Sequence, residues 1–438
     1  MCRGMKESGI EWIGEIPEQW SVRKYKSICN IYAGGTPDTN KLELWNGDIP
    51  WLPSGKIKND DIYEADKFIT NLGLEKSSTK LIKENTTLLA MTGATCGNVG
   101  FLRIKSCANQ SVMAFENLNK SFLDRFIYYT LLSQREAILL QKTGGAQSGI
   151  NVEDGKNLFL PSCSYITQEK IVNYLDKKVS QIDDIISKQK SLIEKYKAYK
   201  QSLITETVTK GLNKNVPMKD SGIEWIGEIP THWSIKKMKY LGELNASGVD
   251  KKIRENEKLY KSVHYVNVYK NGQKEIVNSD NYLVISCDDN KAANCTLIQG
   301  DVLFTNSSET AGDMGTSTVV AEDLVNTLFG YHLMRFRPYS KVLWYKYEKY
   351  LFSSNYMRKW FEYNSVGITR FGLSQRGFSE SQIIYAPYEE QIKIADFLDK
   401  KCNVIDSAIY KKDQIIEKLE AYKKSLIYEC VTGKRQVN

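Results

Sequence analysis

Polar residues set between glycines are the part of this chain that could do chemistry. They occupy two loops, at 144–149 and 367–372, and the segments that follow two short apolar runs, at 88–91 and 302–304. Ser, Thr, Asn, Gln, Lys and Arg side chains can reach base edges and phosphates, and glycine lets a backbone N–H approach them closely. The alternative is that these are ordinary surface loops, since the same residues are the usual residues of turns.

Ten polar residues are the candidates for contact with a nucleic acid. In the first half of the chain they are Lys56, Thr92, Gln110, Gln147 and Ser148, and their approximate counterparts in the second half are Asn267, Ser307, His332, Thr369 and Arg370.

Motifs for catalysis are missing from the sequence. It contains no Gly-x-x-x-x-Gly-Lys-Ser/Thr loop, no Gly-x-Gly-x-x-Gly fingerprint and no Asn/Asp-Pro-Pro-aromatic tetrapeptide. The histidines, His232, His264 and His332, lie in no arrangement typical of a metal site or a catalytic triad. We therefore expect a chain that is not an enzyme and that holds no metal or cofactor.

Length and composition fit a globular protein of two to four domains. The chain has 438 residues, 42% of them hydrophobic, and a mild net charge of +8, which fits a polyanionic partner without requiring one. No apolar run is long enough to span a membrane. Nine scattered cysteines without a Cys-x-x-Cys pair favour a reducing, cytosolic compartment.

The elements that must position these loops are duplicated. Residues 5–21 return at 218–234 with 14 of 17 positions identical, and Leu175-Asp-Lys-Lys returns at Leu398. The first repeat is displaced by 213 residues (218 − 5) and the second by 223 (398 − 175). The intervening stretches, at about 22–165 and 235–388, share their order of loops and helices but little residue identity. Because Met5 aligns with Met218, either Met1 or Met5 could be the true start.

Two long helices are expected near the middle and the end of the chain. Residues 168–207 lack Gly and Pro, and forty residues at about 1.5 Å each give a rod of roughly 60 Å. Heptad steps predict that the two rods pair through Leu175, Ile182, Gln189, Leu203, Leu398, Ile405, Lys412 and Leu426. The predicted seam interleaves these with Ile171, Ile185, Leu192 and Tyr199, and with Ile394, Ala408, Ile415 and Tyr422.

A pseudo-twofold relation between the halves would make the two rods antiparallel. Gln189 and Lys412 would then lie near the axis, where a polar pair fixes register. The alternative is that each helix packs only on its own domain.

The sequence resembles the specificity (S) subunit of Type I restriction-modification systems. The resemblance rests on Gly-Ile-Glu-Trp-Ile-Gly-Glu-Ile-Pro at 9–17 and 222–230, on Gly-Gly-Thr-Pro at 34–37, on Asp-Ile-Pro-Trp at 48–51 and on the helix start at 390–399. It covers essentially the whole chain. The first helix start departs from the second, with Thr167-Gln168 in place of Glu390-Gln391, and the second variable stretch lacks the Gly-Gly-Thr-Pro loop.

The resemblance implies an α+β protein with two globular target-recognition domains and an antiparallel coiled coil. The expected boundaries are 1–165 for the first recognition domain with its N-terminal segment, 166–217 for the central helix and linker, 218–388 for the second recognition domain, and 389–438 for the distal helix. The first conserved segment would lie beside the distal helix and close the chain into a ring.

The implied function is recognition of a split DNA site. Each domain would read one half of an asymmetric site in double-stranded DNA, and the helices would set the spacing and dock two modification subunits. Restriction subunits would join them, and S-adenosylmethionine, ATP and Mg²⁺ would bind to these partners, not to this chain. A shortened rod should then change or abolish recognition, and Gln147 or Arg370 should affect one half-site each.

Two other classes of function stay open from the sequence. One is a fused methyltransferase or nuclease, which purified protein acting alone on DNA would reveal. The other is a coiled-coil scaffold without an active restriction role, which a DNA-binding assay with the methyltransferase partner would distinguish. The target bases and the spacer length cannot be read from the sequence.

Overall fold

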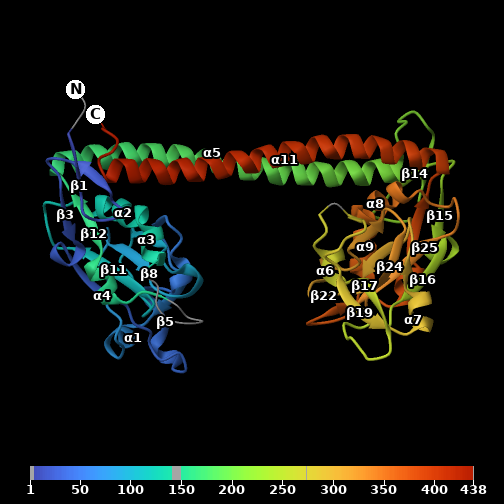
Figure 1. Ribbon diagram of the computed structural model, residues 1–438, viewed down its shortest axis with the longest axis horizontal. Coiled ribbons are helices and arrows are strands. Elements are labelled where there is room, and N and C mark those ends of the chain that lie inside the picture. The colour runs from blue at the N-terminus through green and yellow to red at the C-terminus, as the bar shows by residue number, and fades with distance from the viewer. Residues whose placement is uncertain (1–3, 141–148, 273, 438) are drawn as a thin grey trace. The chain divides into compact units, whose positions relative to one another are not determined.

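The computed structural model describes residues 4–140, 149–272 and 274–437. The chain forms two compact units: unit 1 comprises Met1–Gln189 and Asp413–Asn438, and unit 2 comprises Lys190–Lys412. Each unit joins an α+β globular part to a portion of both long helices, α5 (Tyr165–Lys210) and α11 (Tyr388–Val431) (Figure 1). The predicted α+β class is therefore confirmed. No described helix is long and apolar enough to cross a membrane.

Within unit 1 the two long helices are antiparallel. Lys423 of α11 forms an ion pair of 2.6 Å with Asp183 of α5. Arg435, just beyond the end of α11, donates to the hydroxyl of Tyr174 at 3.4 Å. Moving along the chain from Lys423 to Arg435, the contacted residue of α5 moves back from Asp183 to Tyr174, so the two helices run in opposite directions.

Unit 2 has the same antiparallel pairing. Lys200 of α5 forms an ion pair of 2.6 Å with Asp406 of α11, and the ammonium of Lys412 lies 5.8 Å from the ring centre of Tyr196. The Lys200–Asp406 pair repeats the Asp183–Lys423 pair of unit 1 with the two helices exchanged, since each residue is displaced by 223. That exchange is the pseudo-twofold relation that the repeat predicts.

The eight residues predicted to pair the two helices are all buried or half-buried. Leu175, Leu398 and Leu426 are fully buried, and Ile182 and Ile405 nearly so. Leu203 packs against the core of unit 2, and Gln189 and Lys412 are half-buried; that these last two pair with each other stays a prediction.

The prediction that the interleaved residues lie in the seam is wrong over the middle of both helices. Ile185, Leu192 and Tyr199 are 42%, 38% and 58% exposed, whereas Ile186 and Ile193 are buried. On α11, Ile415 and Tyr422 are likewise exposed and Ile416 is buried. Steps of three-then-four and of four-then-three both return after seven residues. The heptad pattern alone could not choose between the two rows, and packing selects the second.

The globular part of each unit contains a five-stranded sheet of the same topology. Neighbouring strands pair antiparallel, except that the last pair is parallel. In unit 1 the order is β4 (Cys29–Ala33), β11 (Val112–Asn117), β8 (Thr87–Ala90), β9 (Val99–Leu102) and β6 (Asp61–Ile62). In unit 2 it is β16 (Gly242–Ala246), β25 (Leu333–Pro338), β21 (Val302–Thr305), β23 (Ser317–Val320) and β18 (Glu275–Ile276).

A second sheet accompanies the first in each unit. In unit 1 it contains β10 (Cys107–Ala108), β5 (Trp45–Leu52) and β7 (Lys67–Ile69). In unit 2 it contains β19 (Leu283–Cys287), β17 (Lys258–Val263), β24 (Leu324–Phe329) and β20 (Thr296–Leu297). The shorter helices of unit 1 are α1 (Asn71–Glu75), α2 (Asp124–Ser133), α3 (Arg135–Leu140) and α4 (Val152–Asn157). Those of unit 2 are α6 (Tyr265–Tyr269), α7 (Asp289–Asn294), α8 (Tyr345–Ser353), α9 (Asn355–Asn364) and α10 (Gln375–Ser379).

The repeated segments form matching small β-elements. They are the hairpins β1–β2 (Met5–Glu7, Glu15–Pro17) and β13–β14 (Met218–Asp220, Glu228–Pro230), with the pairs β3–β12 (Ser21–Lys24, Phe159–Ser162) and β15–β27 (Ser234–Lys237, Gln382–Tyr385). In unit 1 the hydroxyl of Tyr428 and the ammonium of Lys434 both donate to the carbonyl of Ile13, at 3.1 and 2.7 Å. The first segment therefore lies against the end of α11, and the predicted closure of the chain is confirmed.

A buried glutamine anchors the start of each long helix. Gln168 accepts from the backbone N–H of Leu123 and donates to the carbonyls of Ser121 and Cys163. Gln391 makes the equivalent three bonds: it accepts from the backbone N–H of Trp344 and donates to the carbonyls of Val342 and Ala386. The helix starts that differ at 167 and 390 thus share the residue that organises them.

Candidate nucleic-acid interface

Sheet topology gathers the polar loops of each unit at one edge. Because β4, β11, β8 and β9 alternate in direction, the ends that follow β4 and β8 lie beside the beginnings of β11 and β9. We call this the loop edge of unit 1, formed by residues 34–36, 91–98 and 109–111. The loop edge of unit 2 is formed in the same way by residues 247–251, 306–316 and 330–332.

A short ribbon adds the second polar loop to the loop edge of unit 2. β22 (Ser307–Ser308) pairs with β26 (Phe371–Gly372), and the guanidinium of Arg370 donates to the hydroxyl of Ser307 at 3.3 Å. Arg370 is exposed. Two of the predicted residues, 63 positions apart, therefore meet at this edge, and the cation faces solvent.

His332 lies beside Arg370 with an unusual backbone. Its φ is +67°, and its ring centre lies 4.4 Å from that of Tyr331. Burial lowers the pKa of His332 below its usual 6.5, and the charges of Arg370 and Lys251 lower it further. At neutral pH the ring is uncharged, so it can donate from one nitrogen and accept at the other. Both hydrogen-bonding roles suit a base edge.

Two further residues lie at this edge that the sequence did not point to, Lys251 and Tyr331. Lys251 adds a second exposed cation, and Tyr331, which is 37% exposed, adds an aromatic face. The adjacent lysines at 251–252 were a visible signal in the sequence. Tyr331 directly precedes His332 in the sequence, but its partial exposure at this edge required the fold.

The loop edge of unit 1 is built differently. Thr36 donates to the side-chain oxygen of Gln110, and Thr92 forms a β-bridge with Gly149. The N–H groups of Gly34 and Gly35 bond the carbonyls at 112 and 108, and a Cβ on Gly34 would lie 2.1 Å from a carbonyl oxygen. These glycines thus serve the close packing of the chain itself, and their N–H groups are not free for a phosphate.

The remaining candidates differ in how available they are. Lys56 forms ion pairs with Asp66 at 2.9 Å and Glu64 at 3.7 Å, so its charge is balanced within unit 1. Asn267 caps α6 by accepting from the N–H of His264 at 2.8 Å. Thr369 is exposed, and Gln147 and Ser148 lie outside the described residues. Contact with DNA stays a prediction for all ten.

No group of three potential metal ligands occurs within the described ranges. Free thiols are carried by Cys29, Cys96, Cys107, Cys287, Cys295, Cys402 and Cys430.

Comparison with known proteins identifies matching sequences and a matching fold. The family model described as Type I restriction modification DNA specificity domain matches residues 17–195 and 230–421, which together are most of the chain. The Type I restriction enzyme MjaIX specificity subunit of Methanocaldococcus jannaschii is 27% identical over 242 residues, covering 52% of each chain. The chain therefore spans about half the length of this relative in that alignment.

Two further matches extend over nearly the whole chain. The Type I restriction enzyme MjaVIII specificity subunit of the same organism is 24% identical over 428 residues, covering 96% of this chain and 94% of the relative. A solved chain, from work on complex assembly and conformational transition of the type I R-M system, has a TM-score of 0.71 at 12% identity. It covers 96% of this chain and is itself covered to 99%, so the two share a fold.

Proposed function

The chain belongs to the Type I restriction modification DNA specificity family, and we propose that it is the DNA-recognition subunit of such a complex. In this proposal each loop edge reads one half of a bipartite site in double-stranded DNA. One observation carries it: two units of the same sheet topology present chemically different side chains at equivalent edges. Because the two loop edges carry different side chains on sheets of the same topology, we expect two different half-sites, and hence an asymmetric site.

The loop edge of unit 2 has the chemistry that base reading needs. An exposed guanidinium can bond two acceptors of a guanine, and a neutral imidazole and hydroxyl groups can bond the adjacent base or phosphate. At the loop edge of unit 1, amide and hydroxyl side chains predominate, which suits adenine and thymine or water-mediated contacts.

Partner subunits have a surface on the long helices. Ile185, Leu192 and Tyr199 recur every seven residues on α5 and are exposed, and Ile415 and Tyr422 continue this pattern on α11. An exposed apolar row on a helix is the usual seat for a partner helix. We assign this row to two modification subunits, with restriction subunits joining them.

Chemistry belongs to the partners in this proposal. S-adenosylmethionine, ATP and Mg²⁺ bind to the modification and restriction subunits, and this chain contributes recognition and spacing. Both long helices contribute to both units, so their length sets the number of unread base pairs between the half-sites.

The test is selection of binding sites from a random duplex library by the chain together with its modification subunits. The expected result is one split, asymmetric sequence with a fixed spacer. Binding without sequence preference would refute the reading function, and methylation or cleavage by the chain alone would refute its non-catalytic role.

A further inference from the structure

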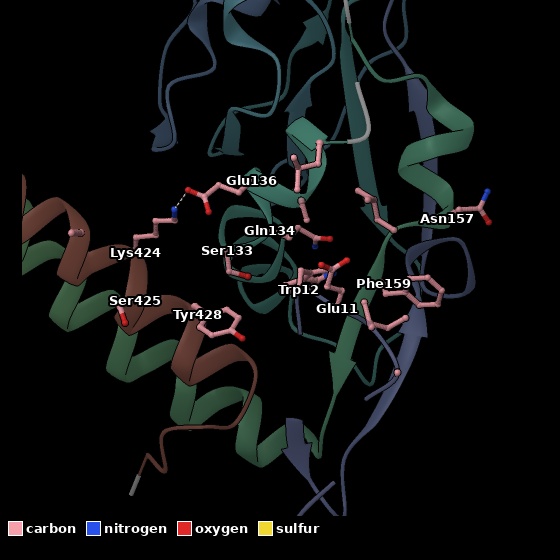
Figure 2. Close-up of a pocket in the computed structure, with 16 residues that line it drawn as sticks. Glu11, Trp12, Ser133, Gln134, Glu136, Asn157, Phe159, Lys424, Ser425 and Tyr428 are labelled. Carbon is pink, nitrogen blue, oxygen red and sulfur yellow. Dashed lines mark hydrogen bonds and ion pairs between the residues drawn. The ribbon is translucent and has the colours of Figure 1, made fainter. Parts of the chain in front are cut away.

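Unit 1 contains an apolar groove next to the first repeated segment. It has a volume of about 810 Å³ and is bounded by residues 9–12, helix α3, the start of β12 and one face of α11. Trp12, Ala137, Leu140, Leu158 and Phe159 supply its apolar lining (Figure 2). Trp12 is half-buried, and Leu140 is 88% exposed.

One ion pair crosses the side of the groove that faces α11. Lys424 of α11 bonds Glu136 of α3, as the dashed line in Figure 2 shows, and this bond lowers the pKa of the Glu136 carboxyl. The pair fixes α3 against the long helix. Beyond this pair the lining is mostly apolar, although Glu11, Gln134 and Asn157 also border the groove, and the buried side-chain oxygen of Gln134 has no hydrogen-bond partner among the described residues.

The second unit shows what fills the equivalent place. Arg135 and Arg358, 223 positions apart, make the same kind of bond: Arg135 donates to Asn98 at 3.3 Å and Arg358 to Thr316 at 3.2 Å. This correspondence aligns α3 with α9. Two positions further along, Ala137 corresponds to Trp360.

In unit 2 the repeated tryptophan therefore has an aromatic neighbour from its own chain. The rings of Trp225 and Trp360 lie 6.4 Å apart between centres, and Tyr363 lies 6.2 Å from Trp225. The hollow that is left there is lined largely by charged side chains, among them Glu224, Lys359 and Glu362. In unit 1 an alanine replaces the indole, and the space beside Trp12 is open.

We propose that the groove beside Trp12 receives an aromatic side chain from a protein partner. The second unit shows that an indole fits beside this tryptophan, and a buried aromatic side chain removes about 150–250 Å² from water. Tryptophan and tyrosine are also the residues that most often dominate protein interfaces. The identity of the partner rests on the proposed function: it is one of the two modification subunits. The two copies then bind unequally, because the groove of unit 2 already holds Trp360.

Filling the groove tests this proposal. Ala137→Trp places in unit 1 the residue that occupies the same position in unit 2, and Leu140→Asn makes the exposed rim polar without changing a buried side chain. Calorimetric titration of the full chain with its modification subunit should show two sites in the wild type. Ala137→Trp should weaken one site at least tenfold, about 1.4 kcal/mol, and Leu140→Asn should weaken the same site about three- to tenfold, with the other site unchanged.

A matched control and two distinct outcomes complete the experiment. Leu42→Asn changes another exposed leucine of unit 1, 78% exposed and outside the groove, and should leave both sites as in the wild type. Unchanged binding at both sites by both groove variants would overturn the groove proposal while leaving the proposed function intact. A wild-type chain that binds no modification subunit would overturn the proposed function itself.

Discussion

Replacement of Arg370 by alanine should relax recognition of one half-site and leave the other half-site intact. The guanidinium of Arg370 has five N–H donors, and one of them bonds Ser307. The remaining donors of this exposed side chain are sufficient for a bidentate contact with the O6 and N7 atoms of guanine. Such a contact discriminates against a wrong base by about 1–3 kcal/mol, or roughly 5- to 150-fold in affinity.

The size of the affinity loss distinguishes Arg370, which would contact the base, from Ser307, which holds the guanidinium in place. Ser307→Ala keeps the guanidinium and removes one hydrogen bond, which is worth about 0.5–1.5 kcal/mol. We therefore expect Ser307→Ala to weaken binding by roughly tenfold at most, and by less than Arg370→Ala. Thr36→Val is the matched change at the loop edge of unit 1, since it also removes a hydroxyl that bonds a neighbouring side chain. It should affect the opposite half-site.

Fluorescence anisotropy with the assembled modification complex measures these effects. The probes are the selected duplex and two duplexes, each with one half-site scrambled, titrated at several salt concentrations. Arg370→Ala should lose affinity for every duplex that retains the half-site of unit 2. An equal loss on all duplexes, with a salt dependence lower by about one phosphate contact, would show that Arg370 binds the backbone instead. No loss on any duplex would remove Arg370 from the interface.

Three further changes test the frame. Deleting one heptad from each long helix, about 10 Å of rod, should shift or abolish the spacer of the selected site; an unchanged spacer in the same selection would contradict spacing by the helices. Gln391→Leu leaves three backbone groups without their partner and should lower the stability of unit 2 by about 2–5 kcal/mol in urea unfolding. The control is Gln414→Leu, at a half-buried position of α11 whose amide donates to Glu417 of the same helix, and it should change stability little. Burial raises the pKa of Glu348 well above its usual 4.5, so the folded state favours the protonated acid. The stability that this group contributes is therefore fully present below pH 4.5 and is lost as the pH rises through the raised pKa. Glu348→Gln should therefore be more stable than the wild type at neutral pH and should show a flatter stability profile between pH 4 and 8; identical profiles would contradict a buried, neutral Glu348.

Local patterns were sufficient for the frame of the molecule. The repeated segments, the absence of Gly and Pro over forty residues and the heptad recurrence of Leu175, Ile182, Leu398 and Ile405 predicted two long paired helices and a duplicated architecture. These features are legible because helix formation and burial of an apolar row depend on neighbours three to seven positions apart.

The sequence also determined which residues could read DNA, but only by type. It supplied Ser307, His332 and Arg370 as candidates without showing that they meet. Tertiary structure decided this, because antiparallel strand order and the β22–β26 ribbon bring together residues from three separate segments. It also decided that the neighbouring groups of Lys56 are carboxylates, and that Gly34 and Gly35 serve internal packing.

Packing likewise decided between alternatives that local periodicity left equal. Ile185 and Ile186 satisfy the same seven-residue step, and only the packing of the other long helix determines that Ile186 is buried and Ile185 is exposed. The groove beside Trp12 has the same origin: Ala137 and Trp360 are unremarkable as single residues, and their effect follows from facing a repeated tryptophan. The sequence thus determines which residues recur along the chain, whereas the fold determines which residues face one another. The reason is that contacts between distant segments produce no periodic pattern in the sequence.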